Sequence, residues 1–270
     1  MKAYKKRLAQ FSASILMVAS IAASANNTKF IQSAIDHPNR MEYDIERDSQ
    51  RKPAQVLEFF DIRPGMTVLD VFSGSGYYTE LLSYVVGPKG TVIAHNNQAY
   101  LNYLEKKLKL RYTDGRLPNV KRITAEANEL SLPENSIDTT FLILAYHDIY
   151  YRPKKKTSWP QIDRVDFLRR LYLSLKPGGI LAIIDHHAES GSPTSTGHDL
   201  HRIAVETVIQ QVSESGFKLM ERAYFLENAT DDLAKHMYAP ELRGKTSRFV
   251  LKFIKPLNIE KHLVDDRIIP

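Results

Sequence analysis

The segment from Val68 to Leu82 constrains the fold of this chain more than any other part. It begins with an apolar run that predicts a buried β-strand, passes through Gly74 and Gly76, and continues as an amphipathic helical pattern. Glycines let the backbone turn sharply and approach a ligand that a Cβ atom would exclude. The helix that follows points its free N–H groups and the positive end of its dipole toward the same crevice. The segment therefore predicts a crevice for a small molecule that carries a nucleoside.

Strand-like and helix-like patterns alternate along the rest of the chain. The predicted strands are 66–72, 91–95, 121–124, 137–144, 180–185, 217–225 and 247–254. The predicted helices are 51–60, 77–86, 98–110, 163–175 and 198–215. A turn at 177–179 separates the fourth of these helices from the fifth strand. This alternation predicts an α/β fold with a doubly wound, mostly parallel, seven-stranded sheet.

The first 25 residues have the three parts of a cleavable signal peptide. A basic region, Lys2–Arg7, precedes a short apolar run, and Ala23-Ser24-Ala25 fits a small-residue cleavage site. The apolar run is shorter than the roughly 20 residues of a membrane-spanning helix. We therefore expect a periplasmic or secreted protein with no stable membrane span after cleavage. An uncleaved N-terminal anchor, or an amphipathic tail bound to nothing, is the alternative.

Composition is consistent with one globular domain and excludes several classes of site. Residues 26–50 form a polar N-terminal extension, 51–257 one α/β domain, and 258–270 a C-terminal tail. The chain has no cysteine, which excludes disulfides, thiolate metal sites and a cysteine nucleophile. The chain has 37 Lys and Arg residues and 31 Asp and Glu residues, and the leader carries four of the basic ones. Without the leader, the net charge of the chain is small and gives no indication of nucleic-acid binding.

Ligands of doubly wound sheets bind beyond the carboxyl ends of the strands, near the point where strand order reverses. The candidate site residues are therefore those that directly follow each predicted strand. They are Phe72 to Gly76, Asn96 and Asn97, Glu126 and Ala127, Tyr146 to Asp148, and His186 and His187.

Three segments resemble motifs of the class I S-adenosylmethionine-dependent methyltransferases, in a likeness that covers about Val56 to Pro256. Residues 68–76 look like the nucleotide loop of that family, and 126–138 resemble its adenine-side acid with the loop beyond. Residues 175–181 resemble the turn into its fifth strand. A narrower resemblance to exported bacterial methyltransferase-like proteins is carried by further short motifs. These are 146–148, 185–186, 201–203 and 243–250.

The resemblance implies S-adenosylmethionine as the cofactor and a methyltransferase that acts on a small-molecule acceptor. A non-catalytic exported module that binds this cofactor, or S-adenosylhomocysteine, is the alternative function. The cofactor-binding residues that the resemblance implies are Asp70, Phe72, Ser73, Gly74, Ser75, Gly76, Asn96, Glu126 and Ala127.

Two residues depart from the family pattern, and a third argues against a dinucleotide site. Phe72 replaces the first glycine of the loop, and Asn96 replaces the acid that holds the ribose hydroxyls. An amide can still make hydrogen bonds but lacks the charge-assisted strength of a carboxylate. A dinucleotide is disfavoured because Thr79 occupies the third glycine position of its motif, and no acid ends the second strand.

Methyl transfer from a sulfonium depends mainly on alignment and needs a base only if the acceptor loses a proton. His147 is the candidate base, with Asp148 as its orienting group, unless the imidazole simply packs over the cofactor. The candidate substrate-binding residues are Tyr146, His186, His201 and Arg202. The guanidinium of Arg202 matches a carboxylate or a phosphate, and a surface pair with Glu206 is its alternative role.

Four histidines raise the question of a metal site, since neutral imidazoles suit zinc and other transition ions. They are His186, His187, His198 and His201. The last two are three residues apart at a predicted helix start, so they could share a helix face. Nothing in the sequence brings the two pairs together, and we predict no metal site.

Overall fold

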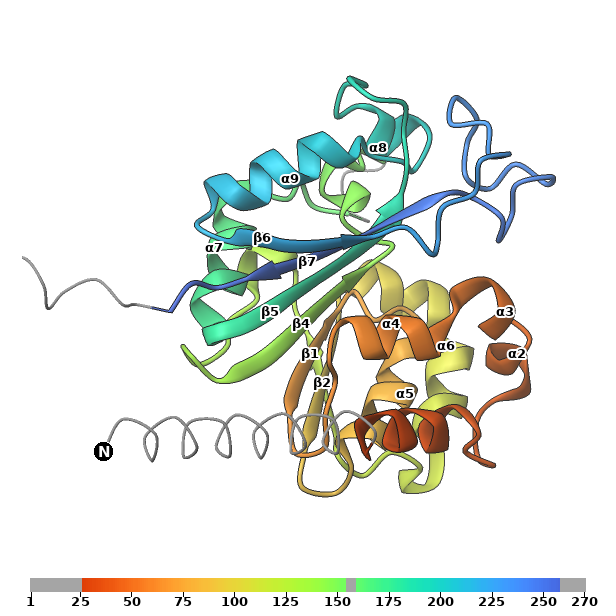
Figure 1. Ribbon diagram of the computed structural model, residues 1–270, viewed down its shortest axis with the longest axis vertical. Coiled ribbons are helices and arrows are strands. Elements are labelled where there is room, and N and C mark those ends of the chain that lie inside the picture. The colour runs from red at the N-terminus through yellow and green to blue at the C-terminus, as the bar shows by residue number, and fades with distance from the viewer. Residues whose placement is uncertain (1–25, 154–158, 258–270) are drawn as a thin grey trace, which may run out of the picture.

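In a computed structural model of the chain, the structure describes residues 26–153 and 159–257 (Figure 1). The predicted signal peptide, 1–25, and the predicted tail, 258–270, lie outside the described residues. Within the described ranges, every helix is too short or too polar to cross a bilayer.

The described residues form one seven-stranded sheet with the order β3-β2-β1-β4-β5-β7-β6. Its strands are β1 Thr67–Val71, β2 Thr91–Asn96, β3 Val120–Thr124, β4 Ile137–Ile143, β5 Leu175–His186, β6 Lys218–Ala223 and β7 Arg248–Ile254. Strands β1 to β5 pair in parallel, and β7 is antiparallel to both of its neighbours. This arrangement confirms the predicted doubly wound, mostly parallel sheet. Strand order reverses between β1 and β4, where such folds bind ligands.

Helices cover both faces of the sheet (Figure 1). The longer ones are α4 Pro53–Phe59, α5 Tyr77–Val86, α6 Gln98–Tyr112, α7 Arg164–Ser174 and α9 Val205–Glu214. The short ones are α2 Glu42–Ile45, α3 Asp48–Arg51, α8 Thr196–Asp199 and a 3₁₀ helix, η3, His147–Tyr150. Residues of α7 and α9 join one apolar core, and residues of α4, α5 and the helical segment 26–35 join the other.

Local signals set several helix boundaries within two residues of the predicted ones. Pro53 occupies the first turn of α4, where its missing N–H has no intrahelical partner to lose. Helix α5 spans the predicted 77–86 because Gly76 and Gly87, both with positive φ, flank it. Asp163 caps α7, since its side chain accepts hydrogen bonds from the backbone N–H groups of Val165 and Asp166.

The predicted helix 198–215 is wrong in its first third. The chain forms α8, ends it at Asp199, and starts α9 only at Val205. Ile203 between them bonds to the end of β5, because its N–H donates to the carbonyl of His186 at 3.0 Å and its carbonyl accepts from Ala188 at 3.0 Å. This long-range pairing replaces the helical hydrogen bonds that the local pattern predicted.

Strand β5 also begins earlier than the predicted 180–185. Leu175 pairs with Ile137 and Ile180 with Thr139, so the residues between Leu175 and Ile180 stand opposite Asp138 alone. The predicted turn at 177–179 is therefore a bulge within the strand, made possible by Gly178 at φ +80°.

The N-terminal extension packs against the rest of the fold. Ile31 and Ala34 are buried in the core that α4 and α5 share. Asp44 of α2 forms a buried ion pair with Arg111 of α6. Residues 26–50 therefore belong to the same packed body, and they supply one wall of the cavity described next.

Candidate functional site

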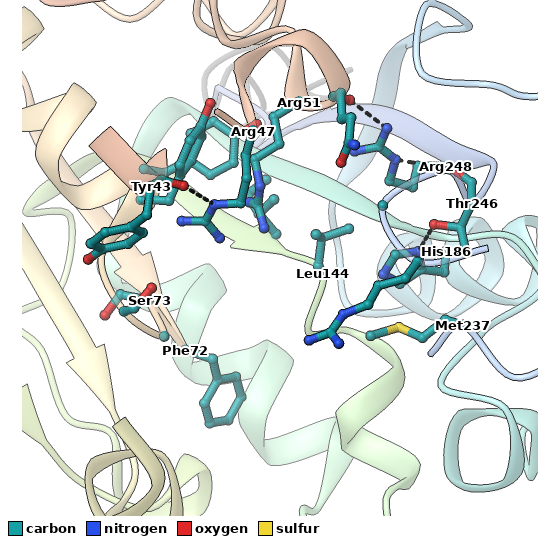
Figure 2. Close-up of a pocket in the computed structure, with 18 of the residues that line it drawn as sticks. Tyr43, Arg47, Arg51, Phe72, Ser73, Leu144, His186, Met237, Thr246 and Arg248 are labelled. Carbon is teal, nitrogen blue, oxygen red and sulfur yellow. Dashed lines mark hydrogen bonds between the residues drawn. The ribbon is translucent and has the colours of Figure 1, made fainter. Parts of the chain in front are cut away.

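A cavity of about 590 Å³ lies beyond the carboxyl ends of β1, β4 and β5, at the point where strand order reverses. This volume lies within the range of small-molecule sites. Its walls come from the loop after β1, from helices α2 and α3, from the ends of β4 and β5, and from residues 237–248 (Figure 2).

The loop after β1 supplies most of the predicted cofactor residues that line the cavity. The predicted residues in the lining are Asp70, Phe72, Ser73, Gly74 and Ser75. Gly74 has φ +58° and Gly76 has φ +85°. Residues with a Cβ atom rarely adopt these backbone conformations. Gly76 lies just outside the lining, at the start of α5, where an added Cβ would stand 3.2 Å from Nε of Arg111.

Asn96, predicted to hold the ribose hydroxyls, instead forms both of its side-chain hydrogen bonds with the glycine loop. Its side-chain oxygen accepts from the backbone N–H of Gly74 at 3.0 Å, and its amide nitrogen donates to the carbonyl of Gly74 at 3.0 Å. Glu126 accepts from the backbone N–H of Gln98 at 3.3 Å. Asn96, Glu126 and Ala127 are not part of the cavity lining, so their predicted contact with a cofactor stays a prediction.

His95 supports the same loop, and sequence reasoning missed it. Its Nδ1 accepts from the backbone N–H of Phe72 at 3.4 Å, and its Nε2 donates to the carbonyl of Ala125 at 3.0 Å. Burial lowers the pKa of His95 to about 4, so the ring is neutral and keeps this donor and acceptor pattern. The available signal was a histidine near the end of an otherwise buried strand.

Asp70, near the end of β1, is a buried carboxyl group at the edge of the cavity. It accepts a hydrogen bond from the hydroxyl of Thr79 at 2.6 Å. Burial raises the pKa of Asp70 to about 7, although the hydrogen bonds from Thr79 partly oppose that shift. A cationic ligand group beside this carboxyl would favour its charged form.

His147, the predicted base, lies between two carboxylates behind the cavity wall. Its Nδ1 is 2.7 Å from Oδ1 of Asp185, and its Nε2 is 3.4 Å from Oδ1 of Asp148. Burial disfavours the charged imidazole, but the charges of Asp185 and Asp148 outweigh burial and raise the pKa of His147 to about 9. At neutral pH this ring is therefore protonated on both nitrogens and positively charged. Asp148 accepts from the hydroxyl of Tyr100 at 2.9 Å, and Tyr100 does line the cavity.

The structure separates the predicted substrate-binding residues. His186 lines the cavity, whereas Tyr146 is fully buried and donates to Gln211 at 2.8 Å. Arg202 is also fully buried and binds Asp231 through two hydrogen bonds of 2.8 and 2.9 Å, so its guanidinium is already occupied. Its alternative pairing with Glu206 is wrong as well, because that carboxylate instead accepts from Ser190 and Gly191.

The histidines considered for a metal do not come together as a group of four. His198 and His201 share no helix face, because α8 ends at Asp199 and His201 has φ +51°. Among the described residues, the group with metal-ligand geometry is His147, Asp148 and His201, whose ligand atoms lie within 4.8 Å of one another. Within it, Nε2 of His147 and Nδ1 of His201 lie 3.4 and 3.7 Å from Oδ1 of Asp148.

Comparison with known proteins gives the same relationship as the motifs. Residues 17–127 match the family model of protein-L-isoaspartate(D-aspartate) O-methyltransferase. The ubiquinone/menaquinone biosynthesis C-methyltransferase UbiE of Citrobacter koseri is 30% identical over 147 residues, which cover 54% of this chain and 53% of that protein. The chain thus spans about half the length of the curated relatives it matches. A solved S-adenosylmethionine-dependent methyltransferase from Aquifex aeolicus is 25% identical with a TM-score of 0.54, covering 84% of this chain and 98% of that chain.

The chain has the class I S-adenosylmethionine-dependent methyltransferase fold. The predicted fold class and the general resemblance are confirmed, while the narrower resemblance to exported proteins stays a prediction. The [4+2]-cyclase SpnF, 17% identical with a TM-score of 0.51 over 77% of this chain and 82% of its own, is a further solved structure with this fold.

Within this methyltransferase fold, much of the cavity wall was missed by sequence reasoning. Cationic side chains line it, namely Arg47, Arg51, Lys107, Arg243 and Arg248. Tyrosines line it as well, namely Tyr43, Tyr77, Tyr78, Tyr100 and Tyr238. The sequence-based candidates came mainly from the ends of predicted strands, whereas most of these residues come from α2, α3, α6 and the segment before β7. Their clustering in one cavity is a tertiary property.

The charge on His147 makes the stability of the fold dependent on pH. His147 binds its proton more tightly in the folded state than in the unfolded state, where the histidine pKa is 6.5. The stabilisation from this proton is therefore complete below pH 6.5. The effect is lost as the pH rises through about 9. We expect the free energy of unfolding, from urea titrations, to fall by on the order of 3 kcal/mol across this window. His147→Gln should flatten this fall, and an unchanged profile would contradict the ion pairing.

Proposed function

We propose that the chain is an S-adenosylmethionine-dependent methyltransferase that acts on a small-molecule acceptor. One observation carries the proposal. The cavity joins the glycine loop of a class I methyltransferase fold to a second wall of arginines and His186, and Figure 2 draws Phe72 and Ser73 across the opening from His186 and Arg248. This arrangement offers room for a donor at the loop and an acceptor opposite it.

The residues at the loop fit such a cofactor. Gly74 and Ser75 bring backbone close to the cavity without a bulky side chain, and the carboxyl of Asp70 can face a cationic group. When bound, S-adenosylmethionine supplies a methyl group that is already activated for transfer. The chain then has to hold, orient and desolvate the acceptor.

His147 and Asp148 act in this proposal as positioning residues. They do not line the cavity, and their link to it is the hydrogen bond from Tyr100 to Asp148. The charged His147 fixes the carboxylate of Asp148, and Asp148 fixes the hydroxyl of Tyr100, whose ring packs 5.9 Å from that of Phe72. A base role for His147 itself requires a pH above its pKa of about 9.

The names of the relatives support methyl transfer but no particular acceptor atom. The family model is named for an O-methyltransferase, and the curated relatives are named as C-methyltransferases. We therefore propose a small-molecule acceptor without assigning its atom.

Calorimetry on residues 26–270 with S-adenosylmethionine and S-adenosylhomocysteine tests the proposal. We expect both to bind, and Asp70→Ala to weaken binding, while Asp166→Ala on the outer side of α7 leaves it unchanged. No heat at about 1 mM ligand would contradict the cofactor assignment. Binding without methyl transfer to any compound of a broad metabolite panel would favour the non-catalytic module instead.

We also propose that the protein is exported to the periplasm or secreted. The support is the basic, apolar and small-residue pattern of residues 1–25. A reporter enzyme that is active only outside the cytoplasm, fused after residue 60, should be active. Loss of that activity after deletion of 2–25 would support export, and an inactive full fusion would contradict it.

A further inference from the structure

The cavity carries more positive charge than its own carboxylates neutralise. Its cationic lining residues, named above, face only two carboxyl groups among the described lining residues, Glu46 and Asp70. Arg47 is paired with Asp44 behind the wall. Arg51 and Arg248 form no ion pair with any residue in 26–153 or 159–257, so their charges are available to a ligand.

Arg51 lies on α3 and is partly buried. Its guanidinium carbon is 4.6 Å from the ring centre of Tyr77, and no hydrogen bond joins it to another described residue. Burial lowers the pKa of Arg51, and the nearby charge of Arg47 adds to that effect. The fold therefore holds this guanidinium in a place where an anion would stabilise it.

Arg248 lies at the start of β7 and is 9% exposed. One of its terminal nitrogens donates to the carbonyl of Gln50 at 2.6 Å, and its Nε donates to the carbonyl of Thr246 at 3.3 Å. These neutral acceptors orient the guanidinium without neutralising it. Burial lowers the pKa of Arg248, and Arg51 contributes further.

His186, at the end of β5, completes this group. Its Nδ1 is 2.7 Å from the hydroxyl of Thr246, while its buried Nε2 has no hydrogen-bond partner among the described residues. The side chain is 6% exposed and lines the cavity. A buried ring nitrogen without a partner is uncommon in native proteins and indicates a place for a ligand atom. Figure 2 shows His186, Thr246 and Arg248 together, with Leu144 between them and Arg51.

The carboxylate of the cofactor alone does not account for this charge. It can neutralise one guanidinium, and the loop that fits the cofactor lies across the opening from Arg248 and His186 (Figure 2). The cations of the far wall therefore stay available to a second anion.

We propose that Arg248 and His186, together with Arg51 on the other side of Leu144, bind an anionic group of the methyl acceptor, a carboxylate or a phosphate. This inference rests on the proposed function and names the class of its acceptor. The fork of a guanidinium matches either anion, and Nε2 of His186 adds one hydrogen bond when it carries the proton. Thr246 fixes the ring that presents this nitrogen.

Calorimetry with simple probes tests the proposal. Residues 26–270, loaded with S-adenosylhomocysteine, are titrated with benzoate, phenyl phosphate and the neutral benzamide. We expect at least one anion to bind about 10-fold or more tightly than benzamide, since hydrogen bonds to charged groups are the stronger kind. Whichever anion binds more tightly identifies the acceptor group as a carboxylate or a phosphate.

Substitutions locate the bound anion. Arg248→Gln and Arg51→Gln should each weaken anion binding about 10-fold, and His186→Phe should weaken it less. Arg248→Gln and His186→Phe should leave the affinity for S-adenosylhomocysteine within about twofold. The matched control is Arg169→Gln on the exposed face of α7, which should change neither affinity. If Arg248→Gln fails to fold, Arg51→Gln on the short surface helix α3 carries the test.

Two results would overturn the proposal. One is equal binding of the anions and benzamide. The other is anion binding that S-adenosylhomocysteine abolishes, which would assign these cations to the carboxylate of the cofactor. If S-adenosylhomocysteine does not bind at all, the proposed function fails separately. In that case, tighter binding of benzoate or phenyl phosphate than of benzamide to the unloaded protein still supports the anion site, and equal binding contradicts it.

Discussion

Replacing Arg111 with methionine is expected to lower the free energy of unfolding by about 3 kcal/mol. Arg111 is fully buried and forms ion pairs with Asp44 and Glu80, each 1% exposed. Removing one member of a buried ion pair typically costs about 3–5 kcal/mol, because the remaining charge has no compensation. We expect the lower end of this range, because in the variant Asp44 still pairs with Arg47 and Glu80 still pairs with Arg116.

Denaturant titration followed by circular dichroism measures this loss. The control is Arg169→Met, whose exposed ion pair on α7 should be worth less than about 1 kcal/mol. A loss below about 1 kcal/mol for Arg111→Met would show that the buried pairs do not hold the N-terminal segment in place. Because Arg111 also donates to the carbonyl of Ser75 at 2.9 Å, the variant should weaken cofactor binding as well.

Replacing Gly74 with valine is expected to reduce the affinity for S-adenosylhomocysteine by about 30- to 100-fold. Space is not the obstacle, because an added Cβ at Gly74 would meet no atom closer than 3.9 Å. The obstacle is φ +58°, which costs a β-branched residue about 2–3 kcal/mol and favours a different loop conformation. That change would also break the paired hydrogen bonds between Gly74 and Asn96.

Gly191→Val is the matched control for this variant. Gly191 has φ +76° and open space around its Cβ position, but it does not line the cavity. Both variants should lose similar stability in thermal unfolding, while only Gly74→Val loses affinity in calorimetry. If a folded Gly74→Val variant bound S-adenosylhomocysteine with wild-type affinity, the loop would not be part of the cofactor site.

Local patterns were sufficient for most of the sheet and for several helices. Helix α5 could be predicted to the residue because apolar periodicity and two flanking glycines agree. The helix predicted from residue 198 failed because Ile203 pairs with the end of β5, a contact that local spacing does not contain.

Candidate site residues were predicted less completely than the fold. Asp70 and the loop to Ser75 line the cavity as the strand–turn–helix pattern indicated, and His186 lines it as its place after the predicted strand 180–185 indicated. Arg202 shows the limit of this reasoning. Its fork suits an anionic ligand, yet Asp231, 29 residues away, already occupies it.

The sequence by itself determined the alternating α/β fold and the glycine loop, because both depend on residues close together in the chain. The tertiary structure decided which charged groups are free for a ligand. Arg111 meets Asp44 across 67 residues, and Arg248 meets Gln50 across 198. The physical reason is that a charge is neutralised by whatever group the fold brings within about 4 Å, and chain separation does not predict that distance.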